Sequence, residues 1–384
     1  MGTKTGRFFG GTRPVWHAAR SAALLVLLPI VLAFPKPVAA EREDCGGKRS
    51  FTTFTQNAYV GADIGRVMVL DPTDPNYFMN LLQAVTTTYY EMLASQPQVR
   101  MAGIADRIAA GRPDIVALQE VYELRRQSPG DLVLGGQVPA TEVVVDFLQS
   151  LLDALAARGA HYAVAAVTNE TDVEMPMFNL QTGGIDDARL TDREVILVRT
   201  DLPPGHLRVS NPRSGNFANH IVIPGVGLSV LRGWCSVDVF IRGERFRYIN
   251  AHLEEETQPG LQWLQALELL DGPAKTRLPV ILAGDLNTDA NHTNRTWTYD
   301  GLLAAGFADP WNVLRADDPG LTWGHDPGLA DPGWAFVWRI DLVLFKGHGF
   351  VPKRVSVVDK GLRRTEPPLW PSDHAGVAAG FLLR

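Results

Sequence analysis

Short apolar runs bounded by turn residues are the feature that most limits what this chain can fold into. Runs of about four to eight residues that are rich in β-branched and aromatic side chains are typical of strands. Nine such runs occur, at residues 51–58, 115–118, 162–167, 195–198, 236–241, 246–251, 280–283, 340–345 and 355–358. The sequence therefore predicts a protein built around β-sheets, in which strands outnumber helices.

Two longer segments have the periodicity of amphipathic helices. Apolar residues recur three or four positions apart in 78–93 and in 144–155, which predicts a helix in each. The runs 237–241 and 246–250 are separated by a few turn-forming residues, which predicts a hairpin, whereas other runs are joined through helices. This mixture indicates a mixed sheet system and favours an α/β sandwich, with helices covering packed sheets, over a purely parallel wound sheet.

The segment Asn169–Arg193 contains many acidic and glycine residues and has no clean hydrophobic period. It is predicted to be a long loop. Such a loop can be decoration or a lid that faces the substrate, and we favour the lid.

The first forty residues differ in kind from the rest. Basic residues precede an apolar run of fourteen residues, Ser21–Phe34, and small residues follow at Val38–Ala40. This is the layout of a secretory signal peptide, and the run is shorter than the ~20 residues that span a bilayer. We therefore predict a signal peptide over 1–40, a secreted or periplasmic location, and a soluble mature form without a membrane anchor.

Residues 41–384 are predicted to form a single domain, because no repeat, low-complexity block or long linker divides them. The protein is also predicted to be a monomer. Loss of residues 1–40 would remove five basic residues and no acidic ones, which moves the formal charge from −6 to −11. Only short basic clusters remain, such as Lys353 with Arg354 and Arg363 with Arg364. The overall charge gives nucleic-acid binding no support, although a local groove can still be positive.

The two cysteines, Cys45 and Cys235, allow two interpretations. They could pair in an oxidising compartment, or they could be small buried apolar residues. Neither lies in a metal-binding pattern.

Polar residues recur where apolar runs end or begin. Gln119-Glu120 follows 115–118, His252 follows 248–251, Gly284-Asp285-Leu286-Asn287 follows 280–283, Asp341 follows Arg339-Ile340, and Ser372-Asp373-His374 opens the final apolar run. Ligands gather beyond strand ends in sheet proteins, so these groups could converge on one cleft.

Taken singly, each group has an ordinary structural explanation. Glu120 could cap a helix, Asp285 and Asn287 could form an Asx turn, and His252 could be a structural histidine. Together, the carboxylates, amides and imidazoles suit a hard cation and a proton-transfer group. Oxygen ligands select Mg²⁺, Mn²⁺ or Ca²⁺, and the lack of cysteine and HExxH signatures argues against zinc.

Six polar motifs, in this order, resemble the endonuclease/exonuclease/phosphatase superfamily, which includes DNase I, apurinic endonucleases, bacterial sphingomyelinases and inositol polyphosphate phosphatases. The motifs are Asn57, Leu118-Gln119-Glu120, Asn250-Ala251-His252-Leu253, Gly284-Asp285-Leu286-Asn287, Arg339-Ile340-Asp341 and Ser372-Asp373-His374. Thr322-Trp323 also resembles a common feature of the family. The resemblance implies a DNase I-like four-layer α/β sandwich of two mixed sheets flanked by helices.

The resemblance also implies a metal site and a catalytic base. Glu120 would be the main ligand of Mg²⁺, with Asn57 beside it and Asp341 or Asp373 nearby. Mn²⁺ or Ca²⁺ could replace Mg²⁺. Asp285 would orient and deprotonate the attacking water, since a phosphodiester anion repels an unassisted nucleophile.

Two histidines and one amide complete the implied site. Asn287 would hydrogen-bond a phosphoryl oxygen, and His252 would contact the phosphate from the opposite side. His374, oriented by Asp341, would stabilise developing charge or transfer a proton.

The leading hypothesis is therefore a hydrolase of phosphodiesters, in nucleic acid or in a phospholipid head group. A phosphomonoesterase acting on inositol or sugar phosphates is the alternative, and a binding module with an inactive site is a third. The complete set of acidic, amide and imidazole groups counts against the third. Arg193, Arg232 and Trp234 are candidates for the substrate side, although Trp234 suits the core equally well.

Overall fold

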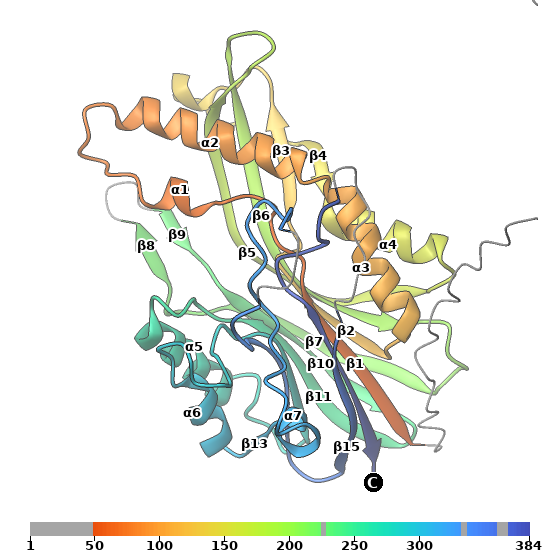
Figure 1. Ribbon diagram of the computed structural model, residues 1–384. Coiled ribbons are helices and arrows are strands. Elements are labelled where there is room, and N and C mark those ends of the chain that lie inside the picture. The colour runs from red at the N-terminus through yellow and green to blue at the C-terminus, as the bar shows by residue number, and fades with distance from the viewer. Residues whose placement is uncertain (1–48, 224–227, 332–335, 359–367) are drawn as a thin grey trace, which may run out of the picture. The chain divides into compact units, whose positions relative to one another are not determined.

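Two β-sheets lie face to face at the centre of the protein (Figure 1). The structure is a computed structural model that describes residues 49–223, 228–331, 336–358 and 368–384, all of which belong to one compact unit. The first sheet has the spatial order β15 (Phe350–Val358), β16 (Gly376–Leu383), β1 (Ser50–Asn57), β2 (Ile115–Gln119), β6 (Ile185–Arg199), β3 (Glu123–Gln127) and β4 (Glu142–Asp146), and β5 (Tyr162–Phe178) also pairs with β6.

The second sheet and a small separate sheet complete the described strands. The second sheet has the order β13 (Phe307–Ala308), β14 (Asp341–Lys346), β12 (Val280–Asp285), β11 (Glu244–His252), β10 (Gly233–Ile241) and β7 (Leu207–Asn216). The small sheet consists of β8 (Ile221–Ile223) and β9 (Leu228–Val230). Both large sheets contain parallel and antiparallel pairs, as the sequence predicts.

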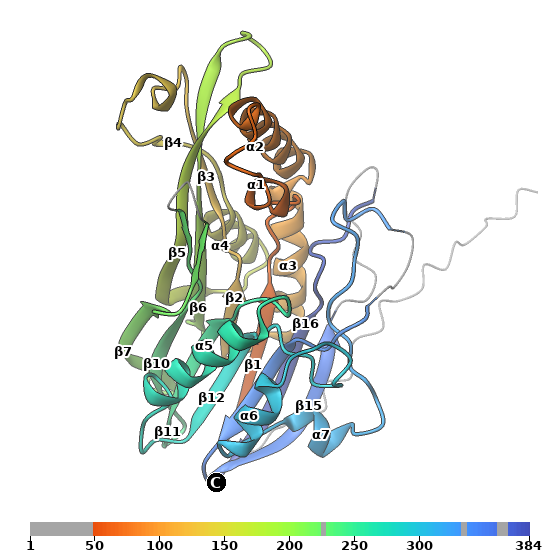
Figure 2. The same cartoon turned by 90° about the vertical axis from the view of Figure 1, so that its left-hand side faces the viewer.

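Helices cover the outer faces of the two large sheets (Figure 2). The described helices are α1 (Gly65–Met68), α2 (Tyr77–Ala94), α3 (Pro97–Gly111), α4 (Phe147–Ala157), α5 (Pro259–Asp271), α6 (Thr298–Ala304) and α7 (Pro310–Leu314), with a 3₁₀ turn, η1, at Leu132–Leu134. Helices α2, α3 and α4 pack on the first sheet, and α5 and α6 pack on the second.

Alternate residues of β2 show how the layers are built. Ile115 and Ala117 belong to the core between the sheets, whereas Val116 and Leu118 belong to the core shared with α2, α3 and α4. Strand β12 alternates in the same way between the intersheet core and the core beneath α5 and α6. Side chains alternate between the two faces of a strand, so strands covered on both faces are apolar throughout. The predicted four-layer sandwich is confirmed.

The predicted helices are present with one change of boundary. Helix α2 covers the first predicted segment, and the second predicted helix begins later, at Phe147. Asp146 caps this helix, because its Oδ1 accepts a hydrogen bond from the backbone N–H of Leu148 at 2.9 Å. Val144, which fitted the helical pattern, belongs to β4.

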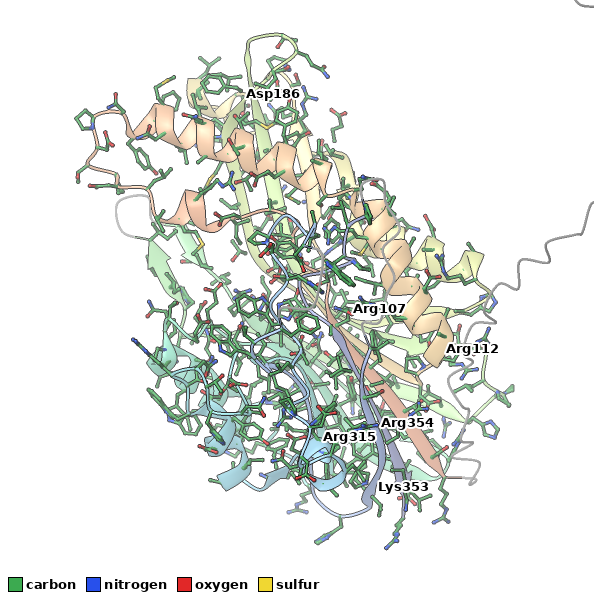
Figure 3. The ribbon with its side chains drawn as sticks, viewed as in Figure 1. Arg107, Arg112, Asp186, Arg315, Lys353 and Arg354 are labelled. Carbon is green, nitrogen blue, oxygen red and sulfur yellow. The ribbon has the colours of Figure 1, made fainter. Side chains whose placement is uncertain are left out.

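The predicted long loop over Asn169–Arg193 is wrong, because these residues form most of a long hairpin between β5 and β6. Two register shifts in β5 disturb the alternation that indicates a strand. Charged residues occur because the strands carry cross-strand ion pairs, such as Arg189 with Asp172 at 2.5 Å. The far end of this hairpin, near Asp186, extends past α2 (Figures 1 and 3).

The predicted hairpin between 237–241 and 246–250 is confirmed by the antiparallel pairing of β10 with β11. Its turn is tighter than expected, because Ile241 pairs with Glu244 and only Arg242 and Gly243 connect the strands. Both connecting residues have positive φ, 53° and 95°, as two-residue hairpin turns of this hand require.

Several predictions concern residues outside the described ranges. The predicted signal peptide, Cys45, and the pair Arg363 and Arg364 lie there. Cys235 is fully buried in the core between the sheets. Among the described helices, none has both the length and the apolar character needed to cross a bilayer.

Candidate active site

Strand pairing brings the predicted polar residues to one end of the two sheets. Strands β1 and β2 are parallel, so Asn57 ends beside the residue that precedes Glu120. In the second sheet, His252 is opposite Asp285, and Asp285 is opposite Asp341. Because the two sheets face each other, both sets of strand ends border the same site.

Asn57 joins the two sheets at this site. Its Nδ2 donates hydrogen bonds to Glu120 Oε1 and to Asp285 Oδ2, both at 3.0 Å. Its Oδ1 accepts a hydrogen bond from the backbone N–H of Tyr59 at 2.8 Å. The amide is fully buried, so these bonds fix the spacing between two carboxylates from different sheets.

Glu120 is held in a strained backbone conformation. Its φ is +55°, in the left-handed region, which costs a non-glycine residue about 1 kcal/mol or more and is often found at functional sites. Its Oε2 accepts a hydrogen bond from the backbone N–H of Val60 at 3.1 Å. The strained turn therefore aims a half-buried carboxylate into the site.

Asp285 lies at the centre of the site because of a close approach between two strands. A Cβ at Gly284, which has a φ of +153°, would be 1.9 Å from the Ala251 carbonyl oxygen, so only glycine allows β11 and β12 to approach here. Asp285 Oδ1 accepts a hydrogen bond from the Asn287 N–H at 3.0 Å. Burial raises the pKa of Asp285 to about 7, while the His374 charge opposes that rise.

His374 is paired with a buried carboxylate. Its Nδ1 is 2.8 Å from Asp341 Oδ2, and its Nε2 is 3.7 Å from Asp285 Oδ2 and 3.9 Å from Asp373 Oδ1. Burial alone would lower the pKa of His374, but the charges of these three carboxylates, Asp341 first, raise it well above its usual value. The ring is therefore an imidazolium at neutral pH, with Nε2–H directed into the site.

The backbone around this pair is fixed by two hydroxyl groups. Thr322 Oγ1 accepts from the Asp341 N–H at 3.1 Å, and Ser372 Oγ accepts from the His374 N–H at 3.0 Å. Ser372 Oγ also donates to the Asn57 carbonyl oxygen at 2.8 Å. These bonds explain the serine in the Ser372-Asp373-His374 motif, which the sequence did not assign to any role.

His252 has a different environment. Arg232 Nη1 is 3.0 Å from His252 Nδ1, and a guanidinium can only donate, so Nδ1 accepts and the proton of the neutral ring is on Nε2. Burial, together with the positive charges of Arg232 and His374, lowers the pKa of His252 well below its usual value. The ring is therefore neutral at physiological pH, and its Nε2 is 3.5 Å from Asp285 Oδ2.

Asn287 presents a second donor beside His252. Its backbone has a φ of +51°, and its Nδ2 donates to the Leu253 carbonyl oxygen at 3.0 Å. Nδ2 is also 3.3 Å from His252 Nε2. Because Nε2 carries a hydrogen, the two groups are both donors, and such a pair suits one shared acceptor from a ligand.

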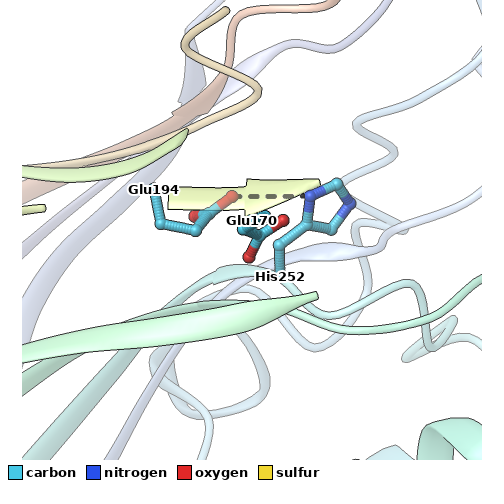
Figure 4. A group of neighbouring side chains, drawn as sticks. All are labelled: Glu170, Glu194 and His252. Carbon is cyan, nitrogen blue, oxygen red and sulfur yellow. Dashed lines mark ion pairs between the residues drawn. The ribbon is translucent and has the colours of Figure 1, made fainter. Parts of the chain in front are cut away.

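A buried acidic group lies behind His252 (Figure 4). Ligand atoms of Glu170, Glu194 and His252 lie within 4.8 Å of one another, and Glu194 Oε1 is 3.5 Å from His252 Nδ1. No described residue makes a hydrogen bond of normal geometry to the side-chain oxygens of either glutamate. Glu170 could not be recognised from the sequence, because it lies in the segment that was predicted to be a loop. Glu194 could not be recognised either, because it directly precedes the apolar run 195–198 and no motif includes it.

The residues present fit a divalent cation. Ligand atoms of Asp285, Asp341 and His374 lie within 4.8 Å of one another, but the imidazolium of His374 has no free lone pair, so the carboxylates are the groups suited to a cation. Asp341 Oδ1 is buried with no hydrogen bond from a described residue. Burial, with repulsion from Glu120, raises the pKa of Asp373 to about 6, while the His374 charge opposes that rise. Buried carboxylates that repel one another are stabilised by a cation, and oxygen donors suit Mg²⁺, Mn²⁺ or Ca²⁺.

Two of the suggested substrate-side residues have structural roles instead. Arg193 Nη2 is 2.5 Å from Asp146 Oδ1, and its Nε donates to the Val121 carbonyl oxygen at 2.8 Å. Trp234 packs against the core beneath α5 and stacks with Arg213, whose guanidinium carbon is 5.7 Å from the ring centroid. Only Arg232 of the three contacts the candidate site.

The basic pair Lys353 and Arg354 lies away from this site (Figure 3). Arg354 pairs with Gly380, which pairs with Thr52 near the start of β1, at the opposite end of the sheet from Asn57. Both basic side chains are exposed. They therefore do not contribute to the charge of the candidate site.

Comparison with known proteins identifies the family. A model of the endonuclease/exonuclease/phosphatase family matches residues 92–374, which is most of the chain. The chain belongs to this family, as its motifs predict.

Two solved structures show the same fold. A family member from Leptotrichia buccalis C-1013-b is 15% identical, with a TM-score of 0.53 over 86% of this chain and 99% of its own. An endonuclease/exonuclease/phosphatase from Beutenbergia cavernae DSM 12333 is 20% identical, with a TM-score of 0.51 over 87% of this chain and 72% of its own. The comparison with curated proteins gave no match.

Proposed function

We propose that this protein is an exported phosphodiesterase that uses a divalent cation, with Mg²⁺ as the expected ion. The observation that carries the proposal is the meeting of Asp285 with a cationic histidine, His374, at 3.7 Å and a neutral histidine, His252, at 3.5 Å. A hydrolase of a phosphoryl anion needs a base for water, a donor for the leaving oxygen and donors for the phosphoryl oxygens. The site offers one candidate base, one candidate donor for the leaving oxygen and a pair of donors for a phosphoryl oxygen.

Asp285 is the proposed general base. Its pKa of about 7 matches a base that works near neutral pH, because such a base is partly ionised and still accepts a proton readily. A water beside Oδ2 would lose its proton to this carboxylate while its oxygen bonds to phosphorus. The ester oxygen on the opposite side leaves and takes a proton from His374 Nε2–H.

The donor pair formed by His252 and Asn287 is proposed to bind a phosphoryl oxygen. Preorganised donors of this kind commonly stabilise a transition state by about 3 to 4 kcal/mol each. Glu120, Asn57 and Asp373 are the proposed holders of the cation. When bound, the cation would act as a Lewis acid that neutralises the nonbridging oxygens.

The test is a substrate panel with the mature protein, residues 41–384. Bis(p-nitrophenyl) phosphate, plasmid DNA, RNA, sphingomyelin and phosphatidylinositol phosphates are each offered with Mg²⁺ and then with EDTA. We expect hydrolysis of at least one diester, its loss in EDTA, and its return when Mg²⁺ is restored. The Asp285→Asn variant, purified in parallel, identifies contaminating activity.

Two outcomes would overturn the proposal. Hydrolysis that survives both EDTA and the Asp285→Asn substitution would remove the metal-assisted mechanism. Hydrolysis of phosphomonoesters without any diester would make the protein a phosphatase. Export is tested separately, by N-terminal sequencing of protein recovered outside the cytoplasm, which should begin after Ala40.

A further inference from the structure

An apolar pocket of about 460 Å³ opens beside the candidate active site. Its walls come from α1 and α2, from the β5–β6 hairpin, and from β8 and β9. Figure 1 shows α1 beside β9, below α2. Sites for small molecules usually have volumes of about 300 to 1,000 Å³, so the pocket is large enough to enclose part of a substrate.

The pocket is lined mainly by aliphatic side chains. Those left partly exposed include Val67, Met68, Val173, Met175, Leu190 and Val230. Water against a concave apolar wall is unfavourable, so the pocket favours an apolar occupant. Aliphatic and methionine side chains adapt to a flexible chain. Among the described residues that line the pocket, Tyr89 and Tyr122 alone contribute aromatic rings.

The pocket and the candidate active site share a wall. Arg232 lines the pocket, and its Nη1 is 3.0 Å from His252 Nδ1. The opposite nitrogen of that ring is 3.5 Å from Asp285 Oδ2. Tyr122 also lines the pocket and closely follows Glu120 in the chain. The pocket and the candidate active site are therefore adjacent, and Arg232 contacts both.

The charges around Arg232, between the pocket and the candidate active site, determine which end of a substrate can enter the pocket. Asp192, Glu254 and Glu255 each lie 3.9 Å from a guanidinium nitrogen of Arg232, so its single positive charge is more than neutralised. An anionic phosphoryl group would be repelled if it moved past these carboxylates into the pocket. The part of the substrate that enters the pocket must be uncharged.

We propose that the pocket binds an aliphatic chain esterified to the phosphoryl group, so that the substrate is a phosphodiester with one hydrocarbon arm. This inference rests on the proposed phosphodiesterase function and adds a substrate class to it. The phosphoryl group lies at Asp285, His252 and His374, and the chain lies between α2 and the β5–β6 hairpin.

A series of p-nitrophenyl alkyl phosphodiesters tests the inference, because the leaving group stays constant while the alkyl chain grows. Chains of two, four, eight and twelve carbons are compared with Mg²⁺ present, below the concentration at which micelles form. Each methylene that enters the pocket should raise kcat/KM by up to about fourfold, until the pocket is full. Equal kcat/KM across the series would overturn the inference.

Matched variants show where the chain binds. Leu190→Gln makes the pocket polar, and Val67→Trp fills it. Both should lower the ratio of dodecyl to ethyl kcat/KM by tenfold or more. Leu264→Gln places the same change on α5, where the side chain is 44% exposed and outside the pocket, and should leave the ratio unchanged. If neither pocket variant changes the ratio, the chain does not bind there.

A binding measurement separates failure of this inference from failure of the proposed function. Dodecyl phosphate and ethyl phosphate are titrated into the protein by calorimetry, which needs no turnover. Tighter binding of dodecyl phosphate that is lost in Leu190→Gln supports the pocket even if no diester is hydrolysed. Equal binding of the two phosphates would overturn the pocket even if diesters are hydrolysed.

Discussion

His374 and His252 approach the same carboxylate oxygen of Asp285, but the first is a cation and the second is neutral. His374 is surrounded by carboxylates and paired with Asp341 at 2.8 Å, so its pKa rises. His252 receives a hydrogen bond from Arg232 at 3.0 Å in a fully buried position, so its pKa falls. Both rings are nearly inaccessible to solvent, so burial alone does not separate them.

The charge state of each buried imidazole is therefore determined by its nearest charged partner, since the residue type is the same. A carboxylate makes His374 a cation that can donate a proton to a leaving group. A guanidinium makes His252 a neutral ring of fixed tautomer that can donate a hydrogen bond without gaining a proton. Both histidines lie beside Asp285, at the end of β12.

Loss of the Asp285 carboxylate, which lies beside both histidine rings, should have the largest effect on catalysis. Asp285→Asn keeps the shape but removes the proposed base, and we expect kcat for bis(p-nitrophenyl) phosphate to fall about 10³-fold or more. Asp271→Asn, on an exposed part of α5, is the matched control and should keep full activity. A kcat within tenfold of the unmodified protein would show that Asp285 is not the base.

Removing the carboxylate beside His374 should affect this ring and leave His252 unchanged. Asp341→Asn should lower kcat by about 10²-fold, because the ring loses the partner that orients it and stabilises its charge. Histidine NMR should show the pKa of His374 falling while His252 stays neutral. An unchanged pKa of His374 would contradict the role given to Asp341.

The stability of the metal-free protein should depend on the pH through Asp285. Its folded pKa of about 7 lies above its ordinary value of 3.8, so the folded state holds a proton that the unfolded state releases. The contribution of Asp285 to the free energy of unfolding is therefore at its maximum below about pH 4, and it is lost as the pH rises to 7. Between pH 5 and 7 the loss should be about 2 kcal/mol.

Urea unfolding in EDTA at pH 5 and pH 7 measures this loss. Asp285→Asn cannot ionise, so the variant should lose about 2 kcal/mol less than the unmodified protein over that interval. Asp271→Asn should behave like the unmodified protein. A matching pH dependence of the unmodified protein and Asp285→Asn would argue that Asp285 is ionised throughout the interval.

The smallest effect is expected for a change at Glu170, in the buried acidic group behind His252, and it concerns the free energy of unfolding. Burial, with repulsion from Asp192, raises the pKa of Glu170 well above its ordinary value, so ionisation of Glu170 opposes folding. Glu170→Gln should raise the free energy of unfolding at pH 8 by about 1 kcal/mol or more. Glu142→Gln, at an exposed position, should change it by less than about 0.5 kcal/mol. Destabilisation by Glu170→Gln would show that the carboxylate has a stabilising partner.

Much of the fold could be predicted because its strands are covered on both faces. Runs such as 115–118 and 280–283 are apolar at every position, and such runs stand out against the turns that bound them. The β5–β6 hairpin could not be predicted in the same way, since its strands carry charged residues and register shifts that break the alternation. Because residues 169–193 were predicted to be a loop, Glu170 and Asp192 were not recognised as buried strand residues beside the site.

The sequence alone was enough to recognise the polar groups that follow the strand ends, because an apolar run that stops at Asp285 or His252 is a local pattern. It also determined the family to which the chain belongs. The folded structure was needed to show that Asn57 links two carboxylates across the sheets, and that one histidine faces Asp341 while the other faces Arg232. Charge state depends on neighbours brought together from distant parts of the chain, and neither spacing nor composition records those neighbours.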